Sequence, residues 1–115
     1  MARQTITVTT SARTGVAPTV FTGVAADGLQ FDNSDQDVLI LAANDTGSSV
    51  DVTFVTDRVV DEDLTVEDRV VSIATGTEKI FGPFNNTDYG GTDYIVSIDI
   101  SADDVTFRAI KMGAL

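Results

Sequence analysis

The sequence contains no histidine, no cysteine and no tryptophan, and it has only two lysines. Without cysteine the chain forms no disulfide, Fe–S cluster or thiol nucleophile, and without histidine as well a typical zinc site is not expected. The absence of histidine also removes the usual general base and every Ser-His-Asp triad. We therefore expect a protein that is not an enzyme and that carries no cofactor, with Ca²⁺ as the one cation considered below.

Long apolar stretches are also missing, and no segment approaches the roughly 18 apolar residues of a membrane span. The first residues, Met1 to Thr5, lack the apolar region of a secretory signal. The five arginines and two lysines are scattered, which argues against nucleic-acid binding, and an anionic membrane surface repels an acidic chain. We expect the protein to be made and kept inside a cell, or packed into a particle there, with neither nucleic acid nor membrane as its partner.

Acid is what the sequence has in excess. Fifteen Asp and three Glu stand against seven basic residues, which gives a net charge of -11 in 115 residues. Such a chain repels itself, and salt screens that repulsion over a short distance. The composition therefore suggests a protein built for concentrated salt, in which the carboxylates form a solvated surface.

Short β-branched runs alternate with turn residues along the whole chain, and helical periodicity is almost absent. Strand-like runs recur roughly every 8–12 residues, a spacing typical of sandwiches. The sequence predicts an all-β protein: a single β-sandwich, jelly-roll or Ig-like, of about eight mostly antiparallel strands. An up-and-down barrel is the alternative.

Residues 38–42 form an unbroken apolar run, which predicts a central strand covered on both faces. A strong turn signal follows at Asn44 to Ser48, and a second strand is expected from Ser49 to Thr56. We expect these two strands to form an antiparallel hairpin.

Two parts of the chain are distinguished. Residues 1–18 are expected to form an N-terminal strand or arm that can dock on a partner, because the alternating strand from Gln4 to Thr9 is lightly charged. Residues 19–115 are expected to form the β-sandwich domain.

A metal site is considered at Asp32, Asp35 and Asp37, where carboxylates lie close together in a loop and suit a hard cation such as Ca²⁺. The segment lacks the central Gly and the terminal Glu of an EF-hand loop. A solvated acidic turn is the favoured interpretation.

Outward-pointing apolar groups are the candidate contacts with a partner. Phe81 is out of phase with Ile80 and is expected to lie opposite the inner face of its strand, and Ile95 lies on the outer face of the strand from Thr92 to Ile100. In the alternative interpretation, the Phe81 strand simply ends in the core with Phe84. The candidate interface residues are Ile6, Val8, Phe81, Pro83, Tyr89 and Ile95.

The stretch from Val38 to Met112 resembles small β-sandwich structural proteins that are encoded beside the capsid genes of tailed double-stranded DNA viruses. The resemblance rests on turn and core motifs: Asn44-Asp45-Thr46-Gly47, Val50-Asp51-Val52, Asp63-Leu64-Thr65-Val66-Glu67-Asp68, Phe81-Gly82-Pro83-Phe84, Tyr89, and two closing strands from Tyr94 to Met112. Residues 1–37 carry no part of it.

This resemblance implies a non-enzymatic virion protein, a head decoration or cement protein that binds the major capsid protein on the capsid exterior. It implies a homo-oligomer, trimer or pentamer, on the particle. The excess of Asp and shortage of Lys resemble proteins of extremely halophilic archaea, which implies a haloarchaeal virus, with a phage of ordinary bacteria as the alternative. A head–tail connector, a tail or turret component, and a soluble recognition module remain as alternatives.

Overall fold

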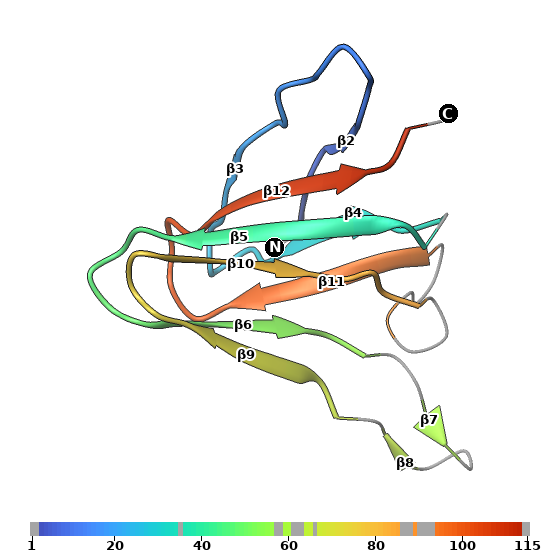
Figure 1. The fold of residues 1–115 in the computed structure, drawn as a ribbon. Helices are drawn as coiled ribbons and strands as arrows, with labels where there is room; N and C mark the ends of the chain where they lie inside the picture. Colours follow the sequence, from blue (N-terminus) through green and yellow to red (C-terminus); the bar gives the residue numbers. More distant parts are fainter. Residues whose placement is uncertain are drawn as a thin grey trace.

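The structure is a computed structural model, and it describes residues 3–34, 36–56, 59–60, 64–65, 67–85, 89 and 94–113. These residues form an all-β fold in which two mixed sheets, each of five strands, pack together like the layers of a sandwich (Figure 1). The all-β prediction is confirmed, but the described residues contribute ten strands to the two layers where about eight were expected.

Sheet A has the strand order β1-β4-β11-β6-β9. Its strands are β1 (Gln4–Thr5), β4 (Leu29–Asp32), β11 (Ile95–Ile100), β6 (Val50–Phe54) and β9 (Arg69–Ile73). Sheet B has the order β10-β5-β12-β2, and β3 also pairs with β12. Its strands are β10 (Thr77–Phe81), β5 (Val38–Asn44), β12 (Thr106–Lys111), β2 (Val8–Thr10) and β3 (Phe21–Thr22).

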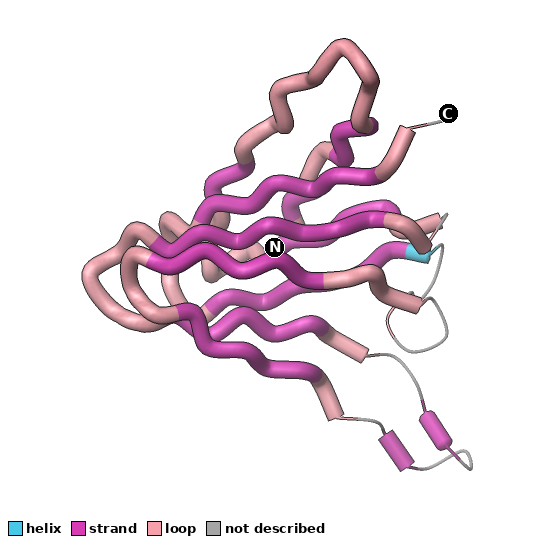
Figure 2. The backbone as a smooth tube through the Cα atoms, in the orientation of Figure 1, coloured by secondary structure: helices cyan, strands magenta, loops and turns pink. Residues whose placement is uncertain are grey.

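A small separate pair, β7 (Val59–Val60) with β8 (Leu64–Thr65), lies beyond the ends of β6 and β9 (Figure 1). Strands make up about half of the described chain, and the long loop of residues 11–20 projects from one side (Figure 2).

Most strand pairs are antiparallel, as predicted, and the two parallel pairs both involve the N-terminal segment. β1 pairs with β4 in sheet A, whereas β2 pairs with β12 in sheet B. Between them Ile6 is 1% exposed and belongs to the core. The single strand expected from Gln4 to Thr9 is therefore two short strands that pass from one sheet to the other, so this segment is built into the sandwich.

Alternating residues of both sheets point inward and form one hydrophobic core. Phe31 and Phe54 from sheet A and Phe107 from sheet B are its largest fully buried side chains. Phe84 closes the core beyond β10, with its ring centroid 4.8 Å from that of Phe54 and 5.8 Å from that of Phe31.

The prediction that β5 and β6 form a hairpin is wrong, because β5 lies in sheet B and β6 in sheet A. Both strands have apolar residues at alternate positions, and these residues are buried because the two strands face each other across the core. A turn signal specifies a reversal of the chain, but it does not specify whether the two strands share a sheet. The connection from β9 to β10 crosses between the sheets in the same way.

Asn44 holds these two crossings together and is fully buried. Its Nδ2 donates to the carbonyl oxygens of Ser48 and Ile73, each at 2.9 Å, and its Oδ1 accepts from the backbone N–H and the hydroxyl of Thr46. The Gly76 N–H donates to the Asn44 carbonyl at 2.7 Å. One amide side chain thus satisfies the turn after β5 and ties it to the end of β9.

Candidate interaction surface

The outer face of sheet B is apolar along much of its length. In β5 the inward residues alternate with Leu39, Leu41 and Ala43, which point away from the core. The pairing register places Ile80 of β10 beside Leu41, and Ile110 of β12 beside Leu39. Together with Pro83 and Met112 at one end, these residues form what we name the apolar face: Leu39, Leu41, Ala43, Ile80, Pro83, Ile110 and Met112.

Several of these side chains meet solvent in the isolated chain. Met112 is 79% exposed, Ile80 is 65% exposed and Leu39 is 38% exposed, while Leu41 and Ile110 are half-buried. The apolar run of β5 predicted a central strand, and β5 is indeed flanked by β10 and β12. The expected cover on its second face is not found among the described residues, since Leu39 remains exposed.

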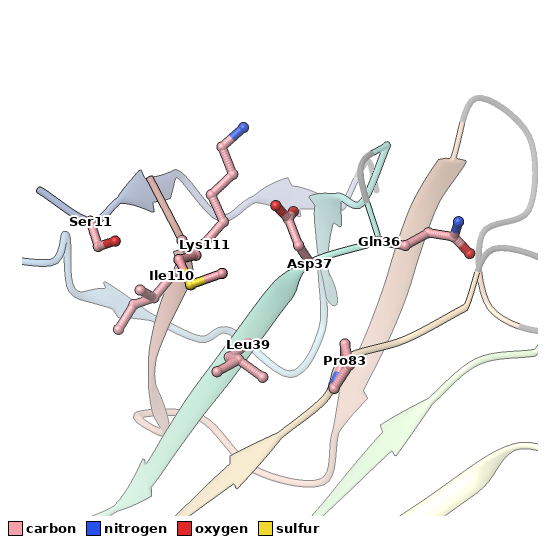
Figure 3. A pocket seen from close by; sticks show the side chains of 8 residues that line it. Ser11, Gln36, Asp37, Leu39, Pro83, Ile110 and Lys111 are labelled. Atoms are coloured by element: carbon pink, nitrogen blue, oxygen red, sulfur yellow. The ribbon is translucent and has the colours of Figure 1, made fainter. Parts of the chain in front are cut away.

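One end of the apolar face is hollowed into a groove of about 480 Å³. Figure 3 shows Leu39 rising from β5 between Ile110 on β12 and Pro83 beyond β10, with Asp37 at the start of β5. The lining residues are Ser11, Gln36, Asp37, Leu39, Pro83, Ile110, Lys111 and Met112. A smaller hollow of about 320 Å³ adjoins it and shares Gln36 and Pro83. The groove therefore combines apolar side chains with several polar and charged ones.

The opposite end of the apolar face carries a charge pair. Arg108 of β12 and Glu78 of β10 approach to 3.5 Å, and both side chains are partly exposed. Such a pair contributes little to stability, but it leaves this part of the surface electrically balanced.

The outer face of sheet A has a different composition. Its outward positions include carboxylates on three strands, Asp32 of β4, Asp51 of β6 and Asp99 of β11. Arg3 binds one of them: its Nη1 lies 2.6 Å from Asp99 Oδ1 and donates to the Ile98 carbonyl at 2.9 Å. Apolar residues on this face include Val70 and Ile95.

The predicted contact residues are distributed over three parts of the molecule. Ile6 is a core residue, and its expected role as a contact is corrected because the crossing between sheets leaves its side chain almost no exposed area. Val8 is half-buried and packs against the core from β2, which pairs with β12 in sheet B. Ile95 is half-buried on the outer face of sheet A, beside Asp32.

The phase predicted for Phe81 is reversed. Phe81 pairs with the inward-pointing Ile40, and its ring centroid lies 4.9 Å from that of Phe54, so it packs on the core. Ile80 points outward instead. Of the predicted set, only Pro83 lines the groove.

Tyr89 packs against the end of the core, with its ring 5.2 Å from that of Phe84. Its hydroxyl accepts a hydrogen bond from Arg69 Nε at 3.3 Å, which raises the pKa of the Arg69 guanidinium. Tyr89 therefore joins the loop after Phe84 to the start of β9, away from the apolar face.

Among the candidate metal ligands, Asp35 lies outside the described residues. Asp32 is engaged locally: its Oδ1 accepts the Ser34 hydroxyl and the Ser34 N–H, and these two hydrogen bonds lower the pKa of the Asp32 carboxyl. Asp37 stands at the groove. No three acidic, histidine or cysteine side chains converge within the described part of the chain.

The residues that sequence reasoning missed are Leu39, Leu41, Ile80, Ile110 and Met112. The signal was present in the apolar run of residues 38–42. An apolar run in a strand predicts that both faces are covered, and the second cover can come from a partner as well as from the same chain.

Comparison with known proteins gives no match: no family model, curated protein or solved structure is significantly similar to this chain. Within the described residues, no helix has the length and hydropathy that crossing a membrane requires.

Proposed function

We propose that the protein is a non-enzymatic structural component of a virion, a capsid decoration or cement protein. In this proposal the apolar face binds the major capsid protein on the exterior of the shell. The apolar face is the observation that carries the proposal, because contiguous apolar surface on a small acidic protein favours a protein–protein contact.

The contrast between the two outer faces suggests an orientation on the shell. The apolar face would be turned toward the capsid, where burying Leu39, Ile80 and Met112 removes exposed apolar area from water. The outer face of sheet A, with its carboxylates, would remain in solvent. A net charge of -11 is best tolerated in concentrated salt, which fits a haloarchaeal virus.

The strand order supports a more specific fold proposal, that of a jelly roll. Without the short β1 and β2, sheet B has the order β3-β12-β5-β10 and sheet A the order β4-β11-β6-β9. These eight strands pair antiparallel throughout, and the chain passes repeatedly from one sheet to the other, as in two Greek keys. Jelly rolls are common in viral capsid proteins and in lectins, so this support is an analogy of fold.

The contact would stabilise the shell by repetition. Each apolar face would contribute a modest affinity, and many identical copies at equivalent sites would resist separation of neighbouring capsid subunits. No chemical step is required of the protein, which agrees with a sequence that has neither histidine nor cysteine.

The copy number in purified virions tests the role in the particle. A decoration protein should be present in hundreds of copies by quantitative mass spectrometry, in proportion to the major capsid protein. A dozen copies or fewer would overturn the decoration role in favour of a connector or tail component. Absence from the particle would overturn the virion role altogether.

A binding experiment tests the face. Particles depleted of the protein are titrated with the wild-type chain, with Leu39→Asp, and with Val70→Asp, a control on the outer face of sheet A where Val70 is 57% exposed. Leu39→Asp should weaken binding by about 100-fold, the effect of losing one interface hot spot. The control should bind like the wild type. Equal binding of all three would exclude the apolar face as the contact.

A further inference from the structure

The edge strands of the sandwich differ in how they are protected. On one side, β1 and β3 have two residues each and β2 has three, so each offers only a short row of backbone groups. On the other side β9 and β10 have five residues each and are consecutive strands of opposite sheets. This second side is the one on which another strand can add to the molecule.

Lys79 protects β9 and leaves β10 uncovered. Its Nζ donates to the Ser72 carbonyl of β9 at 3.1 Å, so the ammonium group lies over sheet A and not over its own strand. A lysine on an edge strand usually hinders the approach of another strand. Here an incoming strand would have to displace the ammonium from β9, whereas Thr77 to Ile80 of β10 are exposed and, among the described residues, β10 has β5 as its sheet partner.

We propose that β10 pairs antiparallel with β10 of a second copy of the chain. The pairing has a two-fold axis normal to sheet B, because the contact joins identical surfaces. Such an axis keeps the outer face of one copy on the same side as the outer face of the other. Side chains directly opposite each other must share a face, so the axis passes between the two copies of one residue, which face each other.

The charged side chains of β10 restrict which residue can face its own copy across the axis. If Glu78 or Lys79 faced its own copy, two like charges would be directly opposite, which is destabilising. With Ile80 on the axis, two isoleucine side chains meet, Lys79 faces Phe81, and Glu78 faces Gly82. Ile80 is 65% exposed in the isolated chain, so this register also covers a large apolar side chain.

The pairing has a consequence for the apolar face. The two sheets B become one continuous sheet, and both apolar faces lie side by side on one side of the pair. A flat partner could then bind both at once and gain from their linkage. The inference stands without the virion role, and its two-fold symmetry differs from the trimer or pentamer that the resemblance to capsid-associated proteins implies.

Salt should govern the association. Each chain carries a charge of -11, so two copies repel each other strongly in dilute buffer, and screening shortens that repulsion to about 3 Å at 1 M salt. The fraction of paired copies should rise as the salt concentration rises, because the contact at Ile80 is apolar.

Cysteine trapping tests the register directly, since the chain has no cysteine of its own. Ile80→Cys places two thiols directly opposite each other, with Cβ atoms about 5 Å apart, close enough for a disulfide after small adjustment. In high salt under mild oxidation, Ile80→Cys should form covalent dimers at least tenfold faster than Val70→Cys, its exposed counterpart on β9. Equal rates would overturn the pairing, and faster linkage of Lys79→Cys would overturn the register.

Sedimentation of the free protein gives a second readout that needs no oxidation. The wild-type chain and Val70→Lys should show the same salt-dependent dimer, while Ile80→Lys, which places like charges on the axis, should remain monomeric with an unchanged circular dichroism spectrum. A wild-type chain that stays monomeric at millimolar concentration in molar salt would overturn the proposal. Because no particle is present, either result is independent of binding to a capsid.

Discussion

The two sheets have similar inner faces and contrasting outer faces. Inward residues of the central strands of both sheets are mostly buried, with Phe54 in sheet A and Phe107 in sheet B at 0% exposure. Outward, sheet A presents carboxylates and hydroxyls, whereas sheet B presents Leu39, Ile80 and Met112. The fold needs only one apolar face per sheet, so folding of the isolated chain does not require the second apolar face of sheet B, and the proposed interaction would account for it.

The largest expected effect separates inner from outer residues of sheet B by their contribution to the free energy of unfolding. Phe107→Ala should lower the free energy of unfolding by about 3–5 kcal/mol, since it removes a large buried ring and leaves a cavity. Ile80→Thr, which keeps a β-branched side chain at an exposed position, should change it by less than about 0.5 kcal/mol. Urea denaturation followed by circular dichroism measures both. A large loss in Ile80→Thr would mean that the outer face serves the fold.

A second variant tests whether Asn44 stabilises the two connections that cross between the sheets. Asn44→Ala removes the hydrogen bonds that join the β5–β6 crossing to the end of β9, and should cost about 2–3 kcal/mol, because buried backbone carbonyls lose their donor. Asp45→Ala, at the exposed neighbouring position, is the control and should be near neutral. The same denaturation measurement applies, and equal effects of the two variants would remove Asn44 from this role.

Charge neutralisation sharpens the contrast between the faces. Asp51→Asn on sheet A should raise stability in dilute buffer by a few tenths of a kcal/mol, roughly 0.3, because it relieves self-repulsion. Glu78→Gln on sheet B should lower stability by a similar amount, because it removes the pair with Arg108. Thermal unfolding at low and at molar salt measures both effects, and both should vanish in molar salt. Shifts of the same sign would contradict the difference in local charge.

The smallest expected effect concerns Asp32. Its pKa is lowered in the folded chain by the Ser34 hydroxyl, so its contribution to stability is complete above the unfolded pKa of about 4 and is lost as the pH falls through the folded pKa. Asp32→Asn should therefore be slightly less stable than the wild type at pH 7, and the difference should close in acid. NMR titration of Ser34→Ala should find the pKa of Asp32 raised toward its usual value; an unchanged pKa would assign the shift to another group.

Sequence reasoning predicted the class of fold from local signals and missed the features that depend on long-range pairing. Alternation predicted one inward face for residues 94, 96, 98 and 100. The last three are buried in β11, because a strand's period is local, whereas Tyr94 precedes β11 and is exposed. The predicted phase of β10 was wrong. Residues on both faces of this edge strand are exposed, with the exception of Phe81, so its apolar pattern does not mark the core. The split at Ile6 was equally hidden, since each half of the segment pairs with a strand that lies far along the chain.

The candidate site could be predicted only in part for the same reason. Pro83 was selected, but the groove also requires Leu39, Ile110 and Met112, which adjoin one another only after β5, β12 and β10 form one sheet. The unbroken apolar run of β5 indicated that its outer face needs a cover, and the sequence does not state which chain supplies it.

Oxidative footprinting of purified virions tests the central claim most directly, namely that the apolar face is the surface through which the protein binds the shell. Met112 is 79% exposed in the free chain, and its thioether is readily oxidised. On the particle, oxidation of Met112 and labelling of Leu39 should fall at least tenfold, while labelling of Val70 on sheet A should not change. Unchanged reactivity of Met112 together with protection of Val70 would contradict the account.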